Sequence, residues 1–167
     1  MVRNFAHWMD GKTGAMRGSE PIERHNPATG ELIARFENGN AEDVDAAVAA
    51  ARHAFDKGPW PHLSGKERGA ALMRLAGLMR RERDKLALLD CEEVGKPIGA
   101  ARGDVDLAID LVENAAGLAQ LHHGDAYSNL GPQRLAMVLS EPIGVAGLIV
   151  PWNFPACILC QKLPYAL

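Results

Sequence analysis

Residues 141–155, EPIGVAGLIVPWNFP, contain the clearest indication of the fold. Its apolar part, residues 144–150, is a continuous run of the kind that a parallel strand buried on both faces requires. Residues 151–155 predict a tight turn, and Ala156 opens the first turns of a helix. A strand, a turn and a helix in this order begin a doubly wound sheet, so we expect an α/β fold.

A lone strand–helix unit cannot bury its strand. The neighbouring strands must therefore come from residues after Leu167 or from another chain. The sequence also ends inside an apolar helical pattern, residues 162–167, that carries no capping signal. We therefore expect the chain to be a fragment of a longer protein.

Three helical patterns precede this unit. The first begins at the N-cap Asn40 and ends at residue 58, and the second begins at a capping box of Ser64 and Glu67 and closes at residues 95–97. The third runs over about residues 98–123. Their predicted apolar faces are Val44, Val48, Ala51 and Phe55 in the first, Leu72, Leu75, Met79 and Leu86 in the second, and Val105, Ala108, Val112, Ala115 and Ala119 in the third.

Shorter β patterns flank the helices. Residues 1–40 are rich in turn formers and enclose a strand-like piece at residues 32–36. Residues 134–140 favour a further strand, which Glu141 and Pro142 interrupt.

The composition is that of a globular chain. The 167 residues are 47% hydrophobic and 23% charged, with a net charge of −3. The densest basic run, residues 80–85, alternates with acidic residues, which predicts a solvated helix face rather than a nucleic-acid site. No apolar run reaches the ~18 residues that span a bilayer, and residues 1–10 do not resemble a signal peptide. From these charge and hydropathy patterns we expect no nucleic-acid or membrane partner. Three cysteines argue against a disulfide framework, so we expect a cytoplasmic protein.

Residues 141–155 closely resemble the signature of the NAD(P)-dependent aldehyde dehydrogenase superfamily. Four upstream stretches are similar to that family in order and spacing: NPATGE at 26–31, the helix at 42–55, GKP at 95–97 and GDVD at 103–106. The resemblance covers essentially the whole chain, and PWNFP in its EPIGV context is its specific part. It implies the N-terminal part of an aldehyde dehydrogenase-like fold, a Rossmann-type cofactor domain with a β bridging or oligomerisation arm, and with the catalytic domain absent.

The resemblance also implies three parts of the chain. Residues 1–124 are expected to be the N-terminal part of the cofactor-binding domain, an irregular β opening followed by helices. Residues 125–142 are expected to form the bridging or oligomerisation strand segment. Residues 143–167 are expected to be the first strand–helix unit of the Rossmann-type sheet, truncated.

The resemblance implies a catalytic role for Asn153. It matches the asparagine whose side-chain amide, in the family, helps bind the oxyanion formed when a cysteine thiolate attacks the aldehyde. This chemistry needs a fixed donor where negative charge develops, and an amide donates without titrating near neutral pH. From the residues alone, Asn153 has the alternative role of shaping a turn.

Other residues near this turn resemble cofactor and substrate positions of the family, which implies NAD or NADP and a small-molecule aldehyde. The cofactor matches are Ile149, Val150, Pro151 and Trp152, at the strand end where open α/β sheets bind ligands. The matches to the substrate tunnel are Phe154, Ile158 and Gln161. Because several subfamilies have an aromatic residue where this chain has Gln161, their substrate preferences do not transfer.

Two charged residues also match the family. Lys162 resembles a lysine beside the tunnel, and we interpret it as structural or electrostatic. Glu93 resembles an acidic position that helps hold a monovalent cation in some members, together with a backbone carbonyl near His25. The alternative for Glu93 is a solvated carboxylate at a helix end.

The cysteines are predicted to be inert. Cys157 and Cys160 form a CxxC pair, but no second CxxC or histidine pair accompanies it, so we predict that both pack in the core. Cys91 precedes two glutamates, which disfavour a thiolate. None of the three matches the nucleophile of the family. The histidines at 122–123 are predicted to interact with the carbonyl end of a helix.

The resemblance implies that the intact protein oxidises an aldehyde to a carboxylic acid through a cysteine thiohemiacetal, and that it is a homo-dimer or homo-tetramer. The nucleophile and the glutamate base lie downstream in the family, so we expect the 167-residue chain alone to be inactive. We also expect it to be poorly soluble, because it would expose an apolar strand. Two alternatives stay open: a natural truncated chain that acts as a non-catalytic oligomerisation partner, and a coenzyme A-dependent acylating or semialdehyde dehydrogenase.

Overall fold

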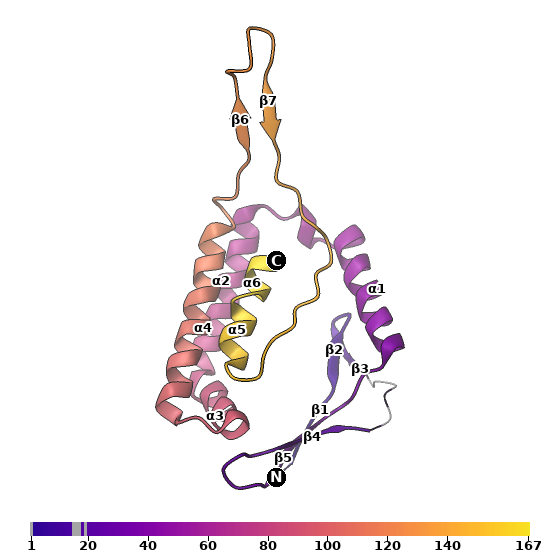
Figure 1. The fold of residues 1–167 in the computed structure, drawn as a ribbon, viewed down its shortest axis with the longest axis vertical. Coiled ribbons are helices and arrows are strands. Elements are labelled where there is room, and N and C mark those ends of the chain that lie inside the picture. The colour runs from indigo at the N-terminus through magenta and orange to yellow at the C-terminus, as the bar shows by residue number, and fades with distance from the viewer. Residues whose placement is uncertain (1, 15–17, 19) are drawn as a thin grey trace.

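The computed structural model describes residues 2–14, 18 and 20–167, and Figure 1 shows how their helices and strands are arranged. The strands are β1 (Arg3–Phe5), β2 (His7–Met9), β3 (Lys12–Gly14), β4 (Ile22–His25), β5 (Leu32–Phe36), β6 (Asp125–Tyr127) and β7 (Ala136–Val138). The helices are α1 (Ala41–Lys57), the 3-10 turn η1 (Trp60–His62), α2 (Gly65–Arg81), α3 (Arg83–Val94), α4 (Ile98–Leu118), α5 (Pro155–Cys160) and α6 (Leu163–Ala166). None of the described helices is long and apolar enough to cross a bilayer.

Helix α4 is the centre of the hydrophobic core, and it packs against α2, α3 and α5 (Figure 1). Its predicted apolar face is confirmed as buried at Val105, Ala108, Val112 and Ala115, whereas Ala119 just beyond its end is half-buried. Small side chains on this face let the neighbouring helices come close. At Gly69 of α2, for example, an added Cβ would lie 2.7 Å from the Ala116 carbonyl oxygen.

Both predicted helix starts are confirmed as capping boxes. The backbone N–H of Asp43 donates to the Asn40 side chain at 3.0 Å, and the Asn40 N–H donates to the Asp43 carboxylate at 2.9 Å. Ser64 and Glu67 exchange the same two bonds, at 3.3 and 2.8 Å. The hydrogen bond from Ser64 lowers the pKa of Glu67, so this carboxylate stays ionised at the start of the helix.

The single helix predicted over residues 64–94 is wrong, because the chain bends at Glu82. The backbone of Glu82 has φ −96° and ψ 12°, outside the α-helical region, and it ends α2 and begins α3. The bend gives α3 its own direction along α4, so that Ala87 is fully buried in the same core. The apolar spacing continues across the bend, which is why the sequence pattern does not reveal it.

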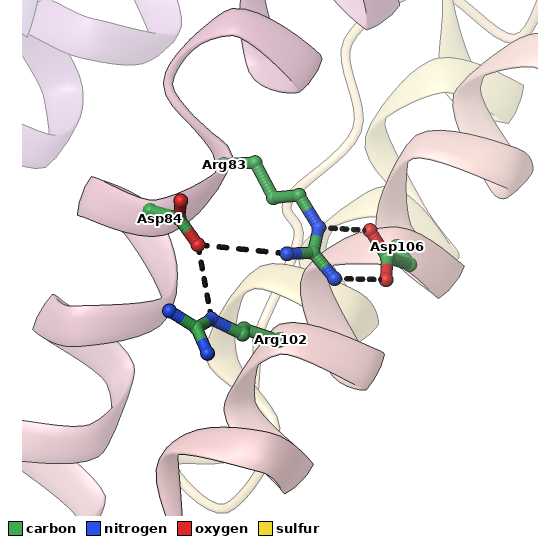
Figure 2. Close-up of polar contacts among 4 residues, drawn as sticks. All are labelled: Arg83, Asp84, Arg102 and Asp106. Atoms are coloured by element: carbon green, nitrogen blue, oxygen red, sulfur yellow. Dashed lines mark hydrogen bonds and ion pairs between the residues drawn. The ribbon is translucent and has the colours of Figure 1, made fainter.

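Two arginine–carboxylate pairs join α3 to α4 on the surface, as Figure 2 shows. Arg83 donates to both carboxylate oxygens of Asp106, each at 2.5 Å, and Arg102 donates to Asp84 at 3.0 Å. Arg83 also lies 3.5 Å from Asp84, which links the two pairs into one network (Figure 2). Because all four side chains contact solvent, the network fixes the direction of α3 more than it adds stability.

Helix α4 ends at Leu118 rather than near His123. Beyond it the backbone tightens into short turns, in which Gln120 donates to the Gly117 carbonyl at 3.3 Å and Leu121 to the Leu118 carbonyl at 2.9 Å. The Nδ1 of His123 lies 2.7 Å from the carbonyl oxygen of Leu121, which lies beyond the end of α4, so the interaction predicted between these histidines and the helix end stays a prediction.

The predicted apolar face of α1 is not buried in this chain. Val44 and Val48 are 60% and 50% exposed. The helix stands apart from the helical core in Figure 1, and its main packing partner is the short turn η1. The spacing therefore predicts the helix correctly and its burial incorrectly, because burial depends on a partner that lies outside the helix itself.

Strand β5 is the central strand of a three-stranded sheet, which confirms the strand predicted at residues 32–36. It pairs in parallel with β1 and antiparallel with β4, with a register shift between Arg24 and His25. Strands β2 and β3 form a separate hairpin. Its turn places Asp10 and Gly11 at φ 53° and 73°, the left-handed region that aspartate and glycine tolerate best.

Strands β6 and β7 form an antiparallel hairpin that projects from the helical part (Figure 1). The strand predicted at residues 134–140 is confirmed in a shorter form, Ala136–Val138. All of β6 is exposed, and Met137 and Val138 are 66% and 52% exposed. No strand other than these two pairs with them in the described part of the chain.

The strand predicted at residues 144–150 is not formed. Within the described residues this segment pairs with no strand, and it runs as an irregular connection from β7 to α5 (Figure 1). Ile143 and Ile149 are 98% and 85% exposed. An apolar sequence alone does not make a strand, because a strand needs backbone partners on a neighbouring segment.

Candidate functional site

The predicted site lies on the turn between this irregular segment and α5. Pro155 occupies the first position of α5, where its fixed φ suits a helix and its missing N–H costs no hydrogen bond. Phe154 is the N-cap, and its carbonyl accepts the first helical bond from Ile158 at 2.9 Å. Because α5 packs on α4, the turn is attached to the helical core.

The side chains of the turn are exposed to different degrees. Trp152 is 71% exposed and Phe154 is 43% exposed. Asn153 is exposed, and its side-chain amide makes no hydrogen bond among the described residues. The amide N–H groups of Asn153 are therefore available to a ligand.

The main chain of the turn is held by Lys96, which sequence reasoning identified only as part of the GKP turn. Its Nζ donates to the Asn153 carbonyl at 2.9 Å and lies 4.4 Å from the centre of the Phe154 ring. The same Nζ donates to Asp104 of α4 at 2.6 Å and lies 3.2 Å from Asp90 of α3. Lys96 thus joins two core helices to the predicted site.

The two carboxylates keep the ammonium of Lys96 charged. Burial alone would lower the pKa of Lys96, but the hydrogen bond to Asp104 and the ion pair with Asp90 outweigh burial, so its pKa lies above the ordinary value. The side chain of Lys96 is 12% exposed, and those of Asp90 and Asp104 are 3% and 18% exposed. A charge buried to this degree is stable only when it is paired.

The backbone of the GKP turn brings Lys96 to this place. Gly95 has φ 77°, in the left-handed region, and caps α3 so that the chain turns directly into α4. An added Cβ at Gly95 would lie 2.7 Å from Cγ of Pro27. The S–H of Cys91 donates to the Lys96 carbonyl at 3.0 Å, which fixes the turn further.

A second lysine holds the other end of the segment. The Nζ of Lys162, which follows α5, donates to the Ile149 carbonyl at 2.6 Å. Lys162 therefore makes a structural contact of the kind that the sequence suggests for it. The predicted cofactor residues, Ile149, Val150, Pro151 and Trp152, lie between this contact and the one made by Lys96.

The predicted tunnel residues lie on one face of α5. Phe154, Ile158 and Gln161 are spaced by four and three residues, which places them on the same side of a helix. Ile158 is half-buried and Gln161 is exposed. The Gln161 amide lies 3.8 Å from the Cys157 sulfur, so its contacts lie within the chain as well as toward solvent.

The adjoining side of α5 is the buried one, and the core role predicted for its cysteines is confirmed. Cys157 and Cys160 are each 5% exposed and are not joined by a disulfide. Burial raises the pKa of both thiols, so they stay protonated at neutral pH. No group of three or more metal-ligating side chains occurs among the described residues.

Glu93 and the strand that contains His25 lie close together. Arg24, next to His25, donates to the Glu93 carbonyl at 2.5 Å, and Pro27 contacts Gly95. The main-chain oxygen of Glu93 therefore already accepts a hydrogen bond from a cation, the guanidinium of Arg24. The cation site at Glu93 stays a prediction.

Comparison with known proteins gives this arrangement a context. The sequence model described as the aldehyde dehydrogenase family matches residues 15–167. Benzaldehyde dehydrogenase, mitochondrial, of Antirrhinum majus is 41% identical over 143 residues, covering 85% of this chain and 27% of that protein. Aldehyde dehydrogenase [NAD(P)+] 1 of Saccharomyces cerevisiae is 42% identical over 164 residues, covering 98% of this chain and 31% of that protein.

The solved structures agree. An NAD-dependent aldehyde dehydrogenase from Sinorhizobium meliloti superimposes with a TM-score of 0.94 at 41% identity, over 99% of this chain and 33% of that chain. The predicted fold class, the N-terminal part of such a fold, is confirmed. The chain spans no more than about a third of the length of these three proteins.

Proposed function

Because this chain belongs to the aldehyde dehydrogenase family, we propose that the whole protein oxidises an aldehyde to a carboxylic acid with NAD or NADP. One observation carries the proposal: the segment over residues 149–154 is held by its main chain, through Lys96 and Lys162, while the side chains of Ile149, Trp152 and Asn153 are exposed. A site prepared in this way can bind ligand atoms without first breaking internal contacts. The NAD(P)+ of one relative's name and the NAD of another's support the cofactor.

Asn153 is the proposed oxyanion donor. When a cysteine thiolate from elsewhere in the whole protein adds to the aldehyde carbon, negative charge develops on the aldehyde oxygen. The Asn153 amide donates to that oxygen, and one such donor lowers the barrier by ~3 kcal/mol. The role of shaping a turn is compatible with this one, because the main chain of Asn153 makes the turn and its side chain is exposed.

Ile149, Val150, Pro151 and Trp152 are the proposed wall of the cofactor cleft. The exposed apolar surface of Ile149 and Trp152, 85% and 71% exposed, suits the face of a flat aromatic ring. A bound nicotinamide supplies a hydride acceptor there. Lys162 holds this segment in place through its hydrogen bond to the Ile149 carbonyl, and its own side chain is not one of the proposed cofactor contacts.

Phe154, Ile158 and Gln161 are the proposed substrate wall. Two apolar side chains and one amide on a single face of α5 suit an aldehyde with an apolar body and some polar character. A coenzyme A-dependent acylating or semialdehyde-specific enzyme would use the same wall, and its turnover would depend on coenzyme A or on a semialdehyde substrate.

The 167-residue chain is proposed to be inactive alone. Cys157 and Cys160 are buried with raised pKa values, and the thiol of Cys91 donates to the Lys96 carbonyl. None of the three is an exposed side chain. The nucleophile and the general base are therefore proposed to come from the rest of the whole protein.

The β6–β7 hairpin is the proposed contact between subunits of a homo-dimer or homo-tetramer. It projects from the helices with exposed apolar side chains and a free edge among the described strands, and such an edge favours pairing with another chain. The same hairpin supports the second candidate, a non-catalytic oligomerisation partner. A cytoplasmic location is proposed from the three free cysteines, although three relatives have mitochondrial in their names.

The test is to express the whole protein and the 167-residue chain separately, and to follow NADH or NADPH formation with a panel of aldehydes, with and without coenzyme A. We expect aldehyde-dependent turnover by the whole protein and none by the short chain. If no longer product exists and the short chain forms a stable oligomer, the second candidate replaces the first.

A further inference from the structure

Lys96 makes more contacts than a simple link between α3 and α4 requires. An ammonium has three N–H donors. One is directed to Asp104 at 2.6 Å, one faces Asp90 at 3.2 Å, and the third reaches the Asn153 carbonyl at 2.9 Å. The contact with Asn153 crosses 57 residues of sequence and leaves the α3–α4 pair altogether.

The charges around Lys96 are unbalanced, because two carboxylates share one ammonium. One cation faces two carboxylates, and Asp90 is 5% exposed with neither of its carboxylate oxygens accepting a hydrogen bond in the described residues. Asp90 therefore depends on the positive charge of Lys96, 3.2 Å away, for its compensation. As a result the Nζ of Lys96 is pulled into one position, between the two helices.

The Asn153 turn is fixed by that position on two sides. The carbonyl of Asn153 accepts from the Nζ, and the ring of Phe154 lies against the same ammonium at 4.4 Å. Fixing the carbonyl and the following side chain leaves the backbone around Asn153 little freedom. The backbone then fixes the position of the Asn153 Cα–Cβ bond, from which the exposed side chain extends.

We propose that Lys96 is a positioning residue: paired with Asp90 and Asp104, it fixes the Asn153 carbonyl and the Phe154 ring and so aims the Asn153 amide at the aldehyde oxygen. This inference rests on the proposed function, because it gives Lys96 a purpose only if Asn153 binds the oxyanion. A misplacement of about 1 Å in such a group lowers the rate by up to about a hundredfold. The effect belongs to kcat, since the oxyanion forms only after the substrate has bound.

The experiment compares variants of the whole protein. Lys96→Met removes the ammonium but leaves two buried carboxylates unpaired, so it can simply unfold. A second variant, Lys96→Met with Asp90→Asn and Asp104→Asn, removes all three charges together, and replacing a buried ion cluster by neutral groups is often harmless to stability. Lys85→Met is the matched control, because Lys85 is exposed on α3 and only 3.9 Å from Glu82.

We expect the triple variant to keep a melting temperature close to that of the wild type and to lose at least about tenfold in kcat, with KM for the cofactor unchanged. In an Asn153→Ala background, the same three substitutions should cost less than about twofold, because a residue that acts through Asn153 has nothing left to position. Lys85→Met should change neither quantity.

Full kcat in a stable triple variant would overturn the inference, and so would independent, multiplicative losses from the triple change and Asn153→Ala. Either result leaves the proposed function intact if the wild type oxidises aldehydes and Asn153→Ala is slow. A wild type without aldehyde oxidation, or an Asn153→Ala variant as fast as the wild type, overturns the proposed function or the role of Asn153, and this inference with it.

Discussion

The helical core and the segment over residues 141–150 are both rich in apolar residues, yet only the core buries them. In α4, Val105 and Val112 are fully buried, whereas Ile143 and Ile149 in the segment are 98% and 85% exposed. Helices satisfy their own backbone bonds, and α2, α3 and α4 follow one another along the chain. A strand needs a backbone partner on another segment, and within the described residues this segment has none. Apolar sequence therefore predicts burial only where the partner is near in the chain.

The largest expected effect comes from placing the same charge in the two regions. Ile109 is 3% exposed in α4, and Ile149 is 85% exposed in the segment. In the 167-residue chain, Ile109→Asp should cost about 4 kcal/mol or more, because it buries an unpaired carboxylate. Ile149→Asp should change the free energy of unfolding by less than about 0.5 kcal/mol and should raise solubility. Urea unfolding followed by circular dichroism measures both free energies of unfolding. Equal decreases in the two variants would contradict the difference in burial between the two regions.

A smaller effect is expected at Gly95, where the core meets the site. Gly95→Ala forces a side chain into φ 77° and against Pro27, so it should cost about 1–3 kcal/mol. Gly77→Ala is the matched control, because Gly77 lies inside α2 with nothing within 4 Å of an added Cβ. That change should be neutral or stabilising by up to about 1 kcal/mol. Thermal unfolding of the two variants measures both effects. A Gly95→Ala protein as stable as the wild type would contradict the tight turn that contains Lys96.

The smallest effect concerns the surface pairs between α3 and α4. The hydrogen bond from Arg83 lowers the pKa of Asp106 below its ordinary value of 3.8. A carboxylate whose pKa is lowered by folding stabilises the protein above its unfolded pKa, and this contribution is lost as the pH falls through the lowered value. The difference in melting temperature between the wild type and Asp106→Asn should thus be constant above about pH 5 and shrink below about pH 4. A difference in melting temperature that stays unchanged in acid would show that the contribution of Asp106 to stability does not depend on its charge.

Local features of the fold follow from the sequence, and features that need a distant partner do not. The caps at Asn40 and Ser64 are signals confined to four residues, and both are confirmed. The bend at Glu82 leaves the apolar spacing unbroken, and the exposure of α1 depends on which surface covers it. Neither can be recognised from periodicity.

The same division applies to the site. The resemblance of residues 141–155 is sufficient to single out Asn153, because the motif is continuous. Lys96 is visible in the sequence only as the middle of a turn. Its partners Asp90 and Asp104 lie on two different helices, and Asn153 lies 57 residues further on, so that their meeting depends on how α3, α4 and α5 pack.

The exposed Asn153 amide is proposed to donate to the reacting oxygen, and the kcat of the whole protein with Asn153→Ala tests this role. We expect kcat to fall by about a hundredfold to a thousandfold in a correctly folded protein. Asn114→Ala, a change at an exposed asparagine of α4 that accepts from Tyr165 at 3.0 Å, should leave kcat within about twofold of the wild type. An Asn153→Ala protein that folds and turns over as fast as the wild type would contradict the claim.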